Sequence, residues 1–327
     1  MKNNERMLTL TKKLIATNSE DPPGREKEVA DILRAHLGEY GIHSTQVGSD
    51  ERPNLIFSTH GEEFGSLVLH GHMDTVPAGP RELWERDPFG SEMIGDLLYG
   101  RGSSDMKGPL AALAETMIVY KEEGHRHPLL FLATSNEEDG CQGAEEVADS
   151  GVLNGVDYGV CAEPTSLDLY LGEKGVCWVK VVATGKAGHS SRPDSGVNAI
   201  DLCIDALQAI KNGEYPCEYH ELMGEYTMNV GVIEGGTQQG VIPDRCEAQI
   251  DMRLVKGQTP ESVFALMGKY LDEAGLSEQV QLECINESYP TITSRDSRIA
   301  GFASDALEAV IGRRPELGVA TYGSDSS

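Results

Sequence analysis

The amino-acid sequence predicts an α/β protein with a smaller α+β domain inserted into it. Helix-like and strand-like stretches alternate through the first half of the chain, which is typical of an α/β fold. Near residue 175 the order becomes strand, helix, two strands, helix and strand, as in a ferredoxin-like unit. We therefore expect three segments: a first domain segment at residues 1–174, an inserted domain at 175–288, and a second segment of the first domain at 289–327.

Apolar spacing predicts the elements of the first domain. Residues 5–40 have helical spacing on both sides of the turn-rich stretch NSEDPPG, so we expect two helices joined by a loop. A third helix is expected at 109–122, where Pro109 suits a first turn. Short apolar runs predict strands at 54–59, 66–71, 128–134 and 157–162.

The inserted domain has its own succession of elements. Strands are expected at 176–185, 226–236, 245–255 and 279–285. Helices are expected at 195–210 and 260–275, and a further helix at 297–312 returns the chain to the first domain.

Composition narrows the class of protein. The 327 residues, 39% of them hydrophobic, are enough for two domains. With 27 Lys and Arg against 53 Asp and Glu, the net charge of −26 disfavours nucleic-acid and membrane partners. No apolar run approaches the roughly 18 residues of a membrane span, the N-terminal stretch has no signal-peptide pattern, and we expect a cytoplasmic protein. Seven cysteines without a C-x-x-C pair suggest reduced core thiols.

Polar side chains alternate at the end of one predicted strand. In HGHMDTVP, His70, His72 and Asp74 follow an apolar run at every second position, so they share one face. A His-x-Asp pair allows the carboxylate to orient an imidazole that binds a metal. Alternatively, these groups mark a strand that leaves the core.

Three further loops carry acidic residues. Asp105 lies in GRGSSDMKG at a helix start, Glu137 and Glu138 lie in SNEEDG after a strand, and Glu163 lies in AEPT after another. Taken singly, each has an ordinary interpretation as a helix cap or a solvated loop acid. Together they occupy the strand ends where ligands gather in open α/β sheets. One histidine with several carboxylates suits zinc or a similar divalent ion, and we hypothesise a pair of metal ions.

Five motifs resemble, in order and spacing, the zinc aminoacylase, acetylornithine deacetylase and succinyl-diaminopimelate desuccinylase family of metallopeptidases. They are HGHMDTVP, GRGSSDMKG, SNEEDG, CAEPT and GKAGHSSRPDSGVNAI. The resemblance implies a zinc-peptidase-like catalytic domain with a central mixed sheet. It also implies that the inserted domain is a lid that pairs two subunits of a homodimer.

The resemblance implies a role for each metal-site residue. His72 and Glu163 would hold one zinc ion, Asp105 would bridge two, and Glu138 would hold the second. Asp74 would orient His72. Glu137 would be the general base, which takes a proton from water and passes it to the leaving amine. Co²⁺ or Mn²⁺ are alternative ions.

Residues of the inserted domain are implied to contact substrate. His189 would reach the partner subunit's site and stabilise the oxyanion, although a lone loop histidine is ordinarily a surface group. Arg253 and Asn229 would bind the substrate carboxylate, a task that suits a guanidinium. Arg253 as a surface strand residue is the alternative.

The implied reaction is hydrolysis of the amide bond of an N-acyl amino acid, of the acetylornithine or succinyl-diaminopimelate type. The alternatives are a dipeptidase or carboxypeptidase of the same family and a non-catalytic metal-binding relative. Two departures from the family pattern are present: Gly240 stands where relatives often have Asn, and no histidine follows His220, although relatives supply one to the second zinc from their C-terminal segment. We therefore expect the 327-residue chain to hold about one zinc ion tightly and to hydrolyse slowly.

Overall fold

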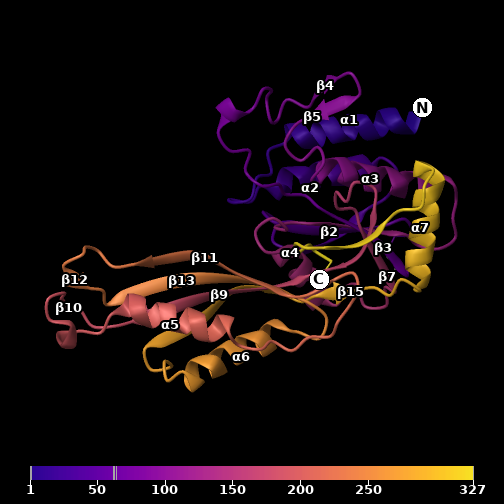
Figure 1. Cartoon of the computed structure of the whole chain (residues 1–327). Helices are drawn as coiled ribbons and strands as arrows, with labels where there is room; N and C mark the ends of the chain where they lie inside the picture. Colours follow the sequence, from indigo (N-terminus) through magenta and orange to yellow (C-terminus); the bar gives the residue numbers. More distant parts are fainter. Residues whose placement is uncertain (1, 62, 64, 327) are drawn as a thin grey trace. The chain divides into compact units, whose positions relative to one another are not determined.

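The computed structural model describes residues 2–61, 63 and 65–326 (Figure 1). Contacts within the chain define two compact units. The first comprises the chain up to Leu167 together with Ser324–Ser326, and the second comprises Asp168–Gly323. The boundaries expected after residues 174 and 288 both fall inside the second unit. The assignment of residues 289–327 to the catalytic domain remains a prediction.

A five-stranded mixed sheet forms the centre of the first unit. Its strands, in spatial order, are β1 (Ser44–Gly48), β2 (Pro53–Ser58), β6 (Leu130–Thr134), β3 (Leu67–His72) and β7 (Tyr158–Cys161). The strands β6, β3 and β7 run parallel, whereas β1 and β2 are antiparallel to their neighbours. The predicted α/β class with a central mixed sheet is confirmed.

Helices cover both faces of this sheet. They are α1 (Lys2–Ala16), α2 (Glu26–Gly38), α3 (Lys107–Glu122) and α4 (Gln142–Ser150). The main core joins the first three helices to one face, where Phe57 and Phe131 stack at 5.6 Å between ring centroids. Val147 of α4 packs with Ile56 and Leu130 on the other face. Every residue of β2 and β6 is therefore buried. Burial of each large apolar side chain stabilises the folded state by about 1.5 to 3 kcal/mol.

The second unit contains a four-stranded antiparallel sheet. Its strands, in spatial order, are β11 (Thr227–Gly235), β13 (Arg245–Leu254), β9 (Gly175–Thr184) and β14 (Val280–Ser288). Helices α5 (Ala199–Lys211) and α6 (Pro260–Glu273) complete the order β9-α5-β11-β13-α6-β14. This is the ferredoxin-like order that the sequence predicts.

Alternation along the strands explains the core of this unit. Cys177, Val179 and Val181 of β9 are buried in the same core cluster as residues of α5 and α6, whereas Trp178 points to the other face and is 38% exposed. The start of α6 is fixed by a capping box, in which the Thr259 hydroxyl accepts a hydrogen bond from Ser262 N.

Smaller elements complete the two units. The second contains a three-stranded sheet of β15 (Thr291–Ile292), β8 (Leu169–Glu173) and β16 (Leu317–Ala320), the helix α7 (Arg298–Ile311), and the pair β10 (Gly188–His189) and β12 (Val241–Ile242). The first contains a hairpin of β4 (Glu92–Ile94) and β5 (Leu97–Tyr99). None of the helices in the described ranges is both long enough and apolar enough to span a bilayer.

Candidate metal centre

The parallel strands β6, β3 and β7 of the first unit end at the same edge of the sheet, and polar residues lie at or just after their ends. His72 is the last residue of β3 and lies beside Thr134, the last residue of β6. Glu137 and Glu138 follow β6, and Glu163 follows β7 two residues after its end. Because the carboxyl ends of parallel strands lie at one edge, residues far apart in sequence become neighbours here.

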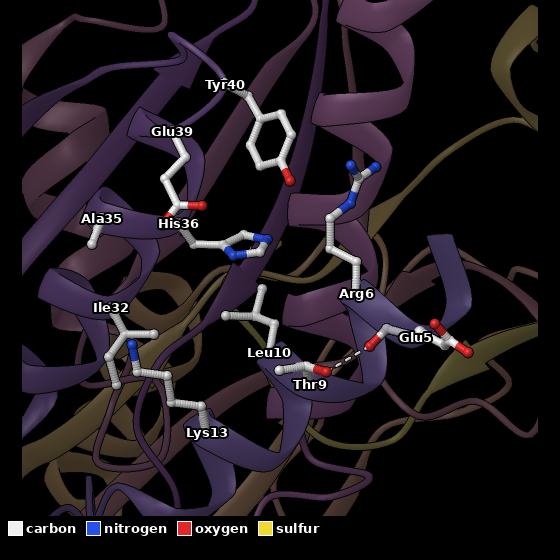
Figure 2. Close-up of a pocket in the computed structure, with 10 residues that line it drawn as sticks. All are labelled: Glu5, Arg6, Thr9, Leu10, Lys13, Ile32, Ala35, His36, Glu39 and Tyr40. Atoms are coloured by element: carbon white, nitrogen blue, oxygen red, sulfur yellow. Dashed lines mark hydrogen bonds between the residues drawn. The ribbon is translucent and has the colours of Figure 1, made fainter. Parts of the chain in front are cut away.

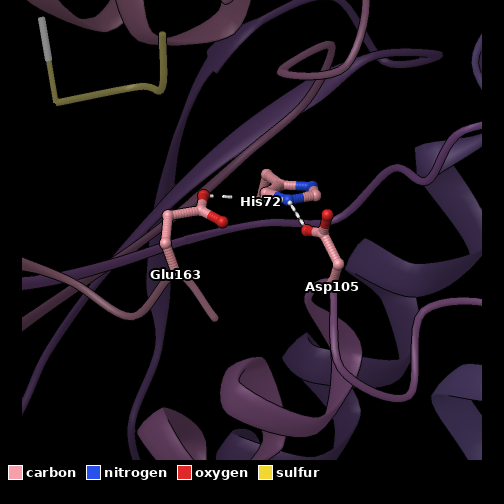
Figure 3. A group of neighbouring side chains, drawn as sticks. All are labelled: His72, Asp105 and Glu163. Atoms are coloured by element: carbon pink, nitrogen blue, oxygen red, sulfur yellow. Dashed lines mark hydrogen bonds and ion pairs between the residues drawn. The ribbon is translucent and has the colours of Figure 1, made fainter. Parts of the chain in front are cut away.

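The imidazole of His72 is the centre of the group. Its Nε2 lies 3.0 Å from Asp105 Oδ1, just before α3, and 3.9 Å from both Glu137 Oε2 and Glu163 Oε1. Figure 3 shows the ring between the carboxylates of Asp105 and Glu163. Two sets have ligand atoms within 4.8 Å of one another: His72 with Asp105 and Glu163, and His72 with Glu137 and Glu138.

Asp74 lies behind the imidazole and is fully buried. Its Oδ1 is 3.4 Å from His72 Nδ1, and its Oδ2 accepts a hydrogen bond from Glu138 N at 3.0 Å. His72 Nδ1 also lies 3.1 Å from the Asp74 carbonyl oxygen, and this hydrogen bond leaves Nε2 directed at the carboxylates, which is the geometry that a metal-binding histidine requires. Asp74 thus links the loop after β3 to the loop after β6.

The two adjacent glutamates have different partners. The Glu138 side chain turns back to the loop after β3, where its Oε1 accepts a hydrogen bond from Val76 N at 3.0 Å. Glu137 instead approaches the imidazole, and only 12% of its side chain is exposed. The two carboxylates therefore enter the centre from different directions.

Burial and mutual repulsion change the acidity of these groups. Burial raises the pKa of Glu137 to about 9 and that of Glu163 to about 7, and it also raises the pKa of Glu138. Burial disfavours a charged His72, but its contacts with Asp105 and Asp74 outweigh this and raise the pKa of the imidazole. The carboxylates outnumber the single imidazole, and one nitrogen with several carboxylate oxygens fits a divalent cation.

Three predicted site residues belong to the second unit. His189 is exposed at the end of β10, where its Nδ1 accepts a hydrogen bond from Ser191 N at 3.2 Å. Asn229 of β11 lies opposite Asp251 of β13, and Arg253 Nε lies 2.9 Å from Asp251 Oδ1. Asn229, Asp251 and Arg253 thus share one face of the sheet. Their roles toward substrate remain predictions.

The sequence patterns did not indicate a second contact near the centre. His70 Nε2 lies 3.0 Å from Thr134 Oγ1 and 3.2 Å from Asp325 Oδ2, and the Thr134 hydroxyl is 2.5 Å from the same carboxylate oxygen. All three residues are buried. Asp325 belongs to the stretch GSDSS. A single acidic residue among small polar neighbours was the only feature of the sequence that could have pointed to this contact.

A pocket of about 430 Å³ lies between α1 and α2, away from these residues (Figure 2). Its Arg6 is already paired with Glu115 at 2.5 Å, and burial lowers the pKa of His36, so the ring is neutral. Thr9 donates its hydroxyl hydrogen to the Glu5 carbonyl at 2.7 Å. We assign this pocket no chemistry.

Residues 68–327 match peptidase family M20/M25/M40, and this match covers most of the chain. The chain belongs to this family. Among the curated relatives is a probable succinyl-diaminopimelate desuccinylase of Staphylococcus aureus strain Mu50, 29% identical over 313 residues, which span 88% of this chain and 78% of the relative. Another is an acetylornithine deacetylase of Edwardsiella ictaluri, 33% identical over 267 residues, or 80% and 69% of the two chains.

Solved structures of the M20 family have the same fold. A metallo-carboxypeptidase from Sulfolobus solfataricus superposes with a TM-score of 0.80, covering 97% of this chain and 86% of its own, at 21% identity. The predicted family is therefore confirmed. This M20 chain is a metal-dependent hydrolase, and the donor set around His72 agrees with that assignment.

Proposed function

We propose that this M20 hydrolase uses zinc to cleave the amide bond of an N-acyl amino acid, of the deacetylase or desuccinylase type. The convergence of His72, Asp105 and Glu163 on one point supports the metal-dependent part of this proposal. The curated relatives named for succinyl-diaminopimelate and acetylornithine support the substrate class. The predicted dipeptidase and carboxypeptidase activities are the alternatives that the experiment below separates.

The chain offers ligands for one ion and a further carboxylate for a second. His72, Asp105 and Glu163 would hold the first ion, and Glu138 would contribute to the second. Asp105 is the most accessible of the four, with 51% of its side chain exposed, and its carboxylate has two oxygens that could serve both ions. A bound divalent cation supplies a Lewis acid that polarises the amide carbonyl and lowers the pKa of water.

Glu137 is the proton carrier in this proposal. Its carboxylate lies beside the ligand set and is not required by the first group of ligands. A carboxylate can take a proton from the attacking water and return it to the leaving nitrogen, but burial raises the pKa of Glu137 to about 9 in the metal-free protein and keeps it protonated near neutral pH. A nearby cation favours the ionised form, so the pKa of Glu137 falls when metal is bound.

The second unit would supply substrate recognition. A guanidinium binds a carboxylate through two hydrogen bonds, so Arg253, with Asn229 on the same sheet face, suits the carboxylate of an amino-acid product. We also propose that the chain forms a homodimer in which His189 serves the partner subunit's site and donates a hydrogen bond to the developing oxyanion.

The proposal is tested by a hydrolysis panel with the zinc-loaded protein. The substrates are N-acetyl-ornithine, N-succinyl-diaminopimelate, the same amino acids with the other acyl group, and dipeptides of matched length. We expect kcat/KM for at least one N-acyl amino acid to exceed that for every dipeptide. Preference for dipeptides would replace the proposed substrate class, and no turnover on any substrate would refute the proposal.

A further inference from the structure

A second group of buried polar residues contacts the start of the loop that carries Glu137 and Glu138. It consists of Asp21, Glu26, Arg52 and Asn136, which we call the buried network. Glu26 is fully buried, and Asp21 and Asn136 are each 3% exposed. Two buried carboxylates need a positive partner, because an unpaired charge in the interior costs several kcal/mol. The guanidinium of Arg52 provides it, since its Nη2 contacts both carboxylates.

Asn136 is held by this group through its backbone and its side chain. Glu26 Oε1 accepts hydrogen bonds from Arg52 Nη2 at 2.9 Å and from Asn136 N at 3.1 Å. Asn136 Nδ2 donates to Asp21 Oδ2 at 2.6 Å, and Arg52 binds that same oxygen. One guanidinium therefore keeps both acceptors of Asn136 in place.

The conformation of Asn136 determines where the chain goes next. Its φ is +61°, in the left-handed region that asparagine tolerates better than most residues. The preceding residue is also held, because Ser135 N donates to Asn54 Oδ1 at 2.9 Å. A backbone in a sparsely populated conformation persists when its surroundings hold it. Glu137 and Glu138 follow immediately, so this turn sets the direction from which they enter the metal centre.

The segment that carries Asp21 also holds the loop after β3. Asp21 N donates to Thr75 O at 2.9 Å, and Thr75 N donates to Ser19 O at 3.1 Å. Carboxylate oxygens of Asp21, Glu26 and Asp74 lie within 4.8 Å of one another. The network thus contacts both loops whose side chains meet at His72.

We propose that the buried network is a positioning device for the reaction: it fixes the turn at Asn136 so that the Glu137 carboxylate faces the reacting water while Glu138 faces metal. The inference rests on the proposed function of Glu137. None of its four members touches metal or substrate in this scheme. A displacement of about 1 Å in a reacting group can cost on the order of 10²-fold in rate.

The first test uses two substitutions at Glu26. Glu26→Ala removes the acceptor for Asn136 N, and we expect kcat to fall on the order of 10²-fold with KM within about threefold of wild type. Glu26→Gln keeps an oxygen acceptor, and we expect it to recover kcat to within about tenfold of wild type.

A substitution at Asn136 tests the same turn without removing a buried charge. Asn136→Gly retains the left-handed φ and the backbone N–H but loses the bond to Asp21, so the protein should fold and kcat should fall about tenfold. The control is Glu115→Ala, which breaks the buried Arg6–Glu115 pair elsewhere in the same unit. It should lower the melting temperature and leave kcat within about twofold of wild type.

Two further measurements do not need turnover. Hydrogen–deuterium exchange of the metal-free protein should show faster exchange at residues 135–138 in Glu26→Ala and near wild-type exchange in Glu26→Gln. Calorimetric titration with Zn²⁺ should show weaker binding in Glu26→Ala and recovery in Glu26→Gln. If wild type hydrolyses nothing in the panel, the proposed function fails and these two measurements decide the positioning role alone.

The positioning role is overturned by either of two results. One is a folded Asn136→Gly protein with wild-type kcat, wild-type exchange and wild-type zinc affinity. The other is an equal loss of kcat in Glu115→Ala, which would show that any buried pair in this unit has the same effect.

Discussion

Glu137 and Glu138 are adjacent in the chain, but the backbone turn before them gives them different partners. The Glu138 carboxylate accepts a hydrogen bond from Val76 N, whereas the Glu137 carboxylate lies 3.9 Å from His72 Nε2. We expect Glu137→Gln to lower kcat by about 10²- to 10⁴-fold, because proton transfer is lost, with little change in zinc content. Turnover and metal analysis of the purified variant check this.

Asp105→Ala provides the comparison for that experiment. Asp105 Oδ1 is the carboxylate oxygen at 3.0 Å from His72 Nε2, so its removal should lower both zinc content and turnover. If Glu137→Gln lost as much zinc as Asp105→Ala, the assignment of Glu137 as the proton carrier and Asp105 as a ligand would be wrong.

The acidic cluster makes the stability of the metal-free protein depend on pH. Burial raises the pKa of Glu137 to about 9 and that of Glu163 to about 7, from ordinary values of 4.5. Between pH 5 and pH 8 the folded protein therefore keeps protons that the unfolded chain has lost, so its stability falls as pH rises. The raised pKa of His72 acts in the same direction, because its stabilisation is lost above its ordinary value of 6.5.

We expect the melting temperature of the chelator-treated protein to decrease from pH 5 to pH 8. The window ends there because burial lowers the pKa of Lys107 to about 8, which opposes the trend at higher pH. Glu137→Gln should make the decrease shallower. Zinc should raise the melting temperature more at pH 8 than at pH 6, since it binds deprotonated ligands. A melting temperature that is constant or rises over this range in the metal-free protein would contradict the account.

The sequence predicted the five side chains that meet at His72 but not the residues that hold their loops. Motifs with alternating or adjacent acids indicate candidate ligands, because the ligand chemistry restricts the residue types. Glu26 had a signal of another kind: it shares the helical spacing of Val29, Ala30, Leu33 and Leu37, which places it on the apolar face of α2. A carboxylate at a core position predicts a buried partner, although the pattern alone does not identify Arg52.

At the scale of elements, the predicted helices and the strongly apolar strands are confirmed, and weakly apolar elements were missed. The strand β1 (STQVG) has one large apolar residue and no buried position, so it has no alternating pattern. In α4 (QGAEEVADS) the buried residues are Gly143 and Val147, too few to give a helical period. Such elements are stabilised by tertiary contacts, which are absent from local sequence.

Gly143 shows how closely α4 approaches the end of β6. A Cβ at this position would lie 2.1 Å from Ser135 O and 2.4 Å from Asn54 Oδ1, both of which belong to the support of the Asn136 turn. We expect Gly143→Ala to destabilise the protein by about 1 to 3 kcal/mol and to lower kcat, because the backbone must move. Denaturant unfolding and steady-state kinetics measure both effects.

Gly268 in α6 is the matched control. A Cβ there would meet nothing within 4 Å, and its backbone is helical. Gly268→Ala should therefore stabilise the protein by about 0.5 to 1 kcal/mol through helix propensity and leave kcat unchanged. Destabilisation of similar size in both variants would show that the close approach at Gly143 is not the cause.

At the scale of the whole molecule, the proposed dimer makes a specific prediction about mixed subunits. If His189 serves the partner's site, a heterodimer of His189→Ala and Glu137→Ala chains has one site with both groups intact. Activity should return on mixing, to at most about half of the wild-type value per dimer. The control mixture is Glu137→Ala with Asp105→Ala, in which each site lacks one group and no activity should appear. Verified heterodimers without recovery would place His189 in its own subunit's site or outside catalysis.

Contacts between residues far apart in the chain could not be predicted from the sequence. The contact between His70 and Asp325 joins β3 to a segment near the other end of the chain, and neither residue has a local pattern that identifies its partner. Family resemblance identified the motif loops because their order and spacing are shared. It did not identify pairs that are defined only by the folded arrangement.

The dispersal of the ligands among β3, β6 and β7 also has a consequence for timing. His72, Glu138 and Glu163 become neighbours only after three strands from distant parts of the chain have aligned in parallel, which is among the slower events of folding. An ion held by these residues would therefore have no complete set of ligands during the early collapse of the chain. We therefore expect metal uptake to come late, and its rate would then report the final assembly of the sheet.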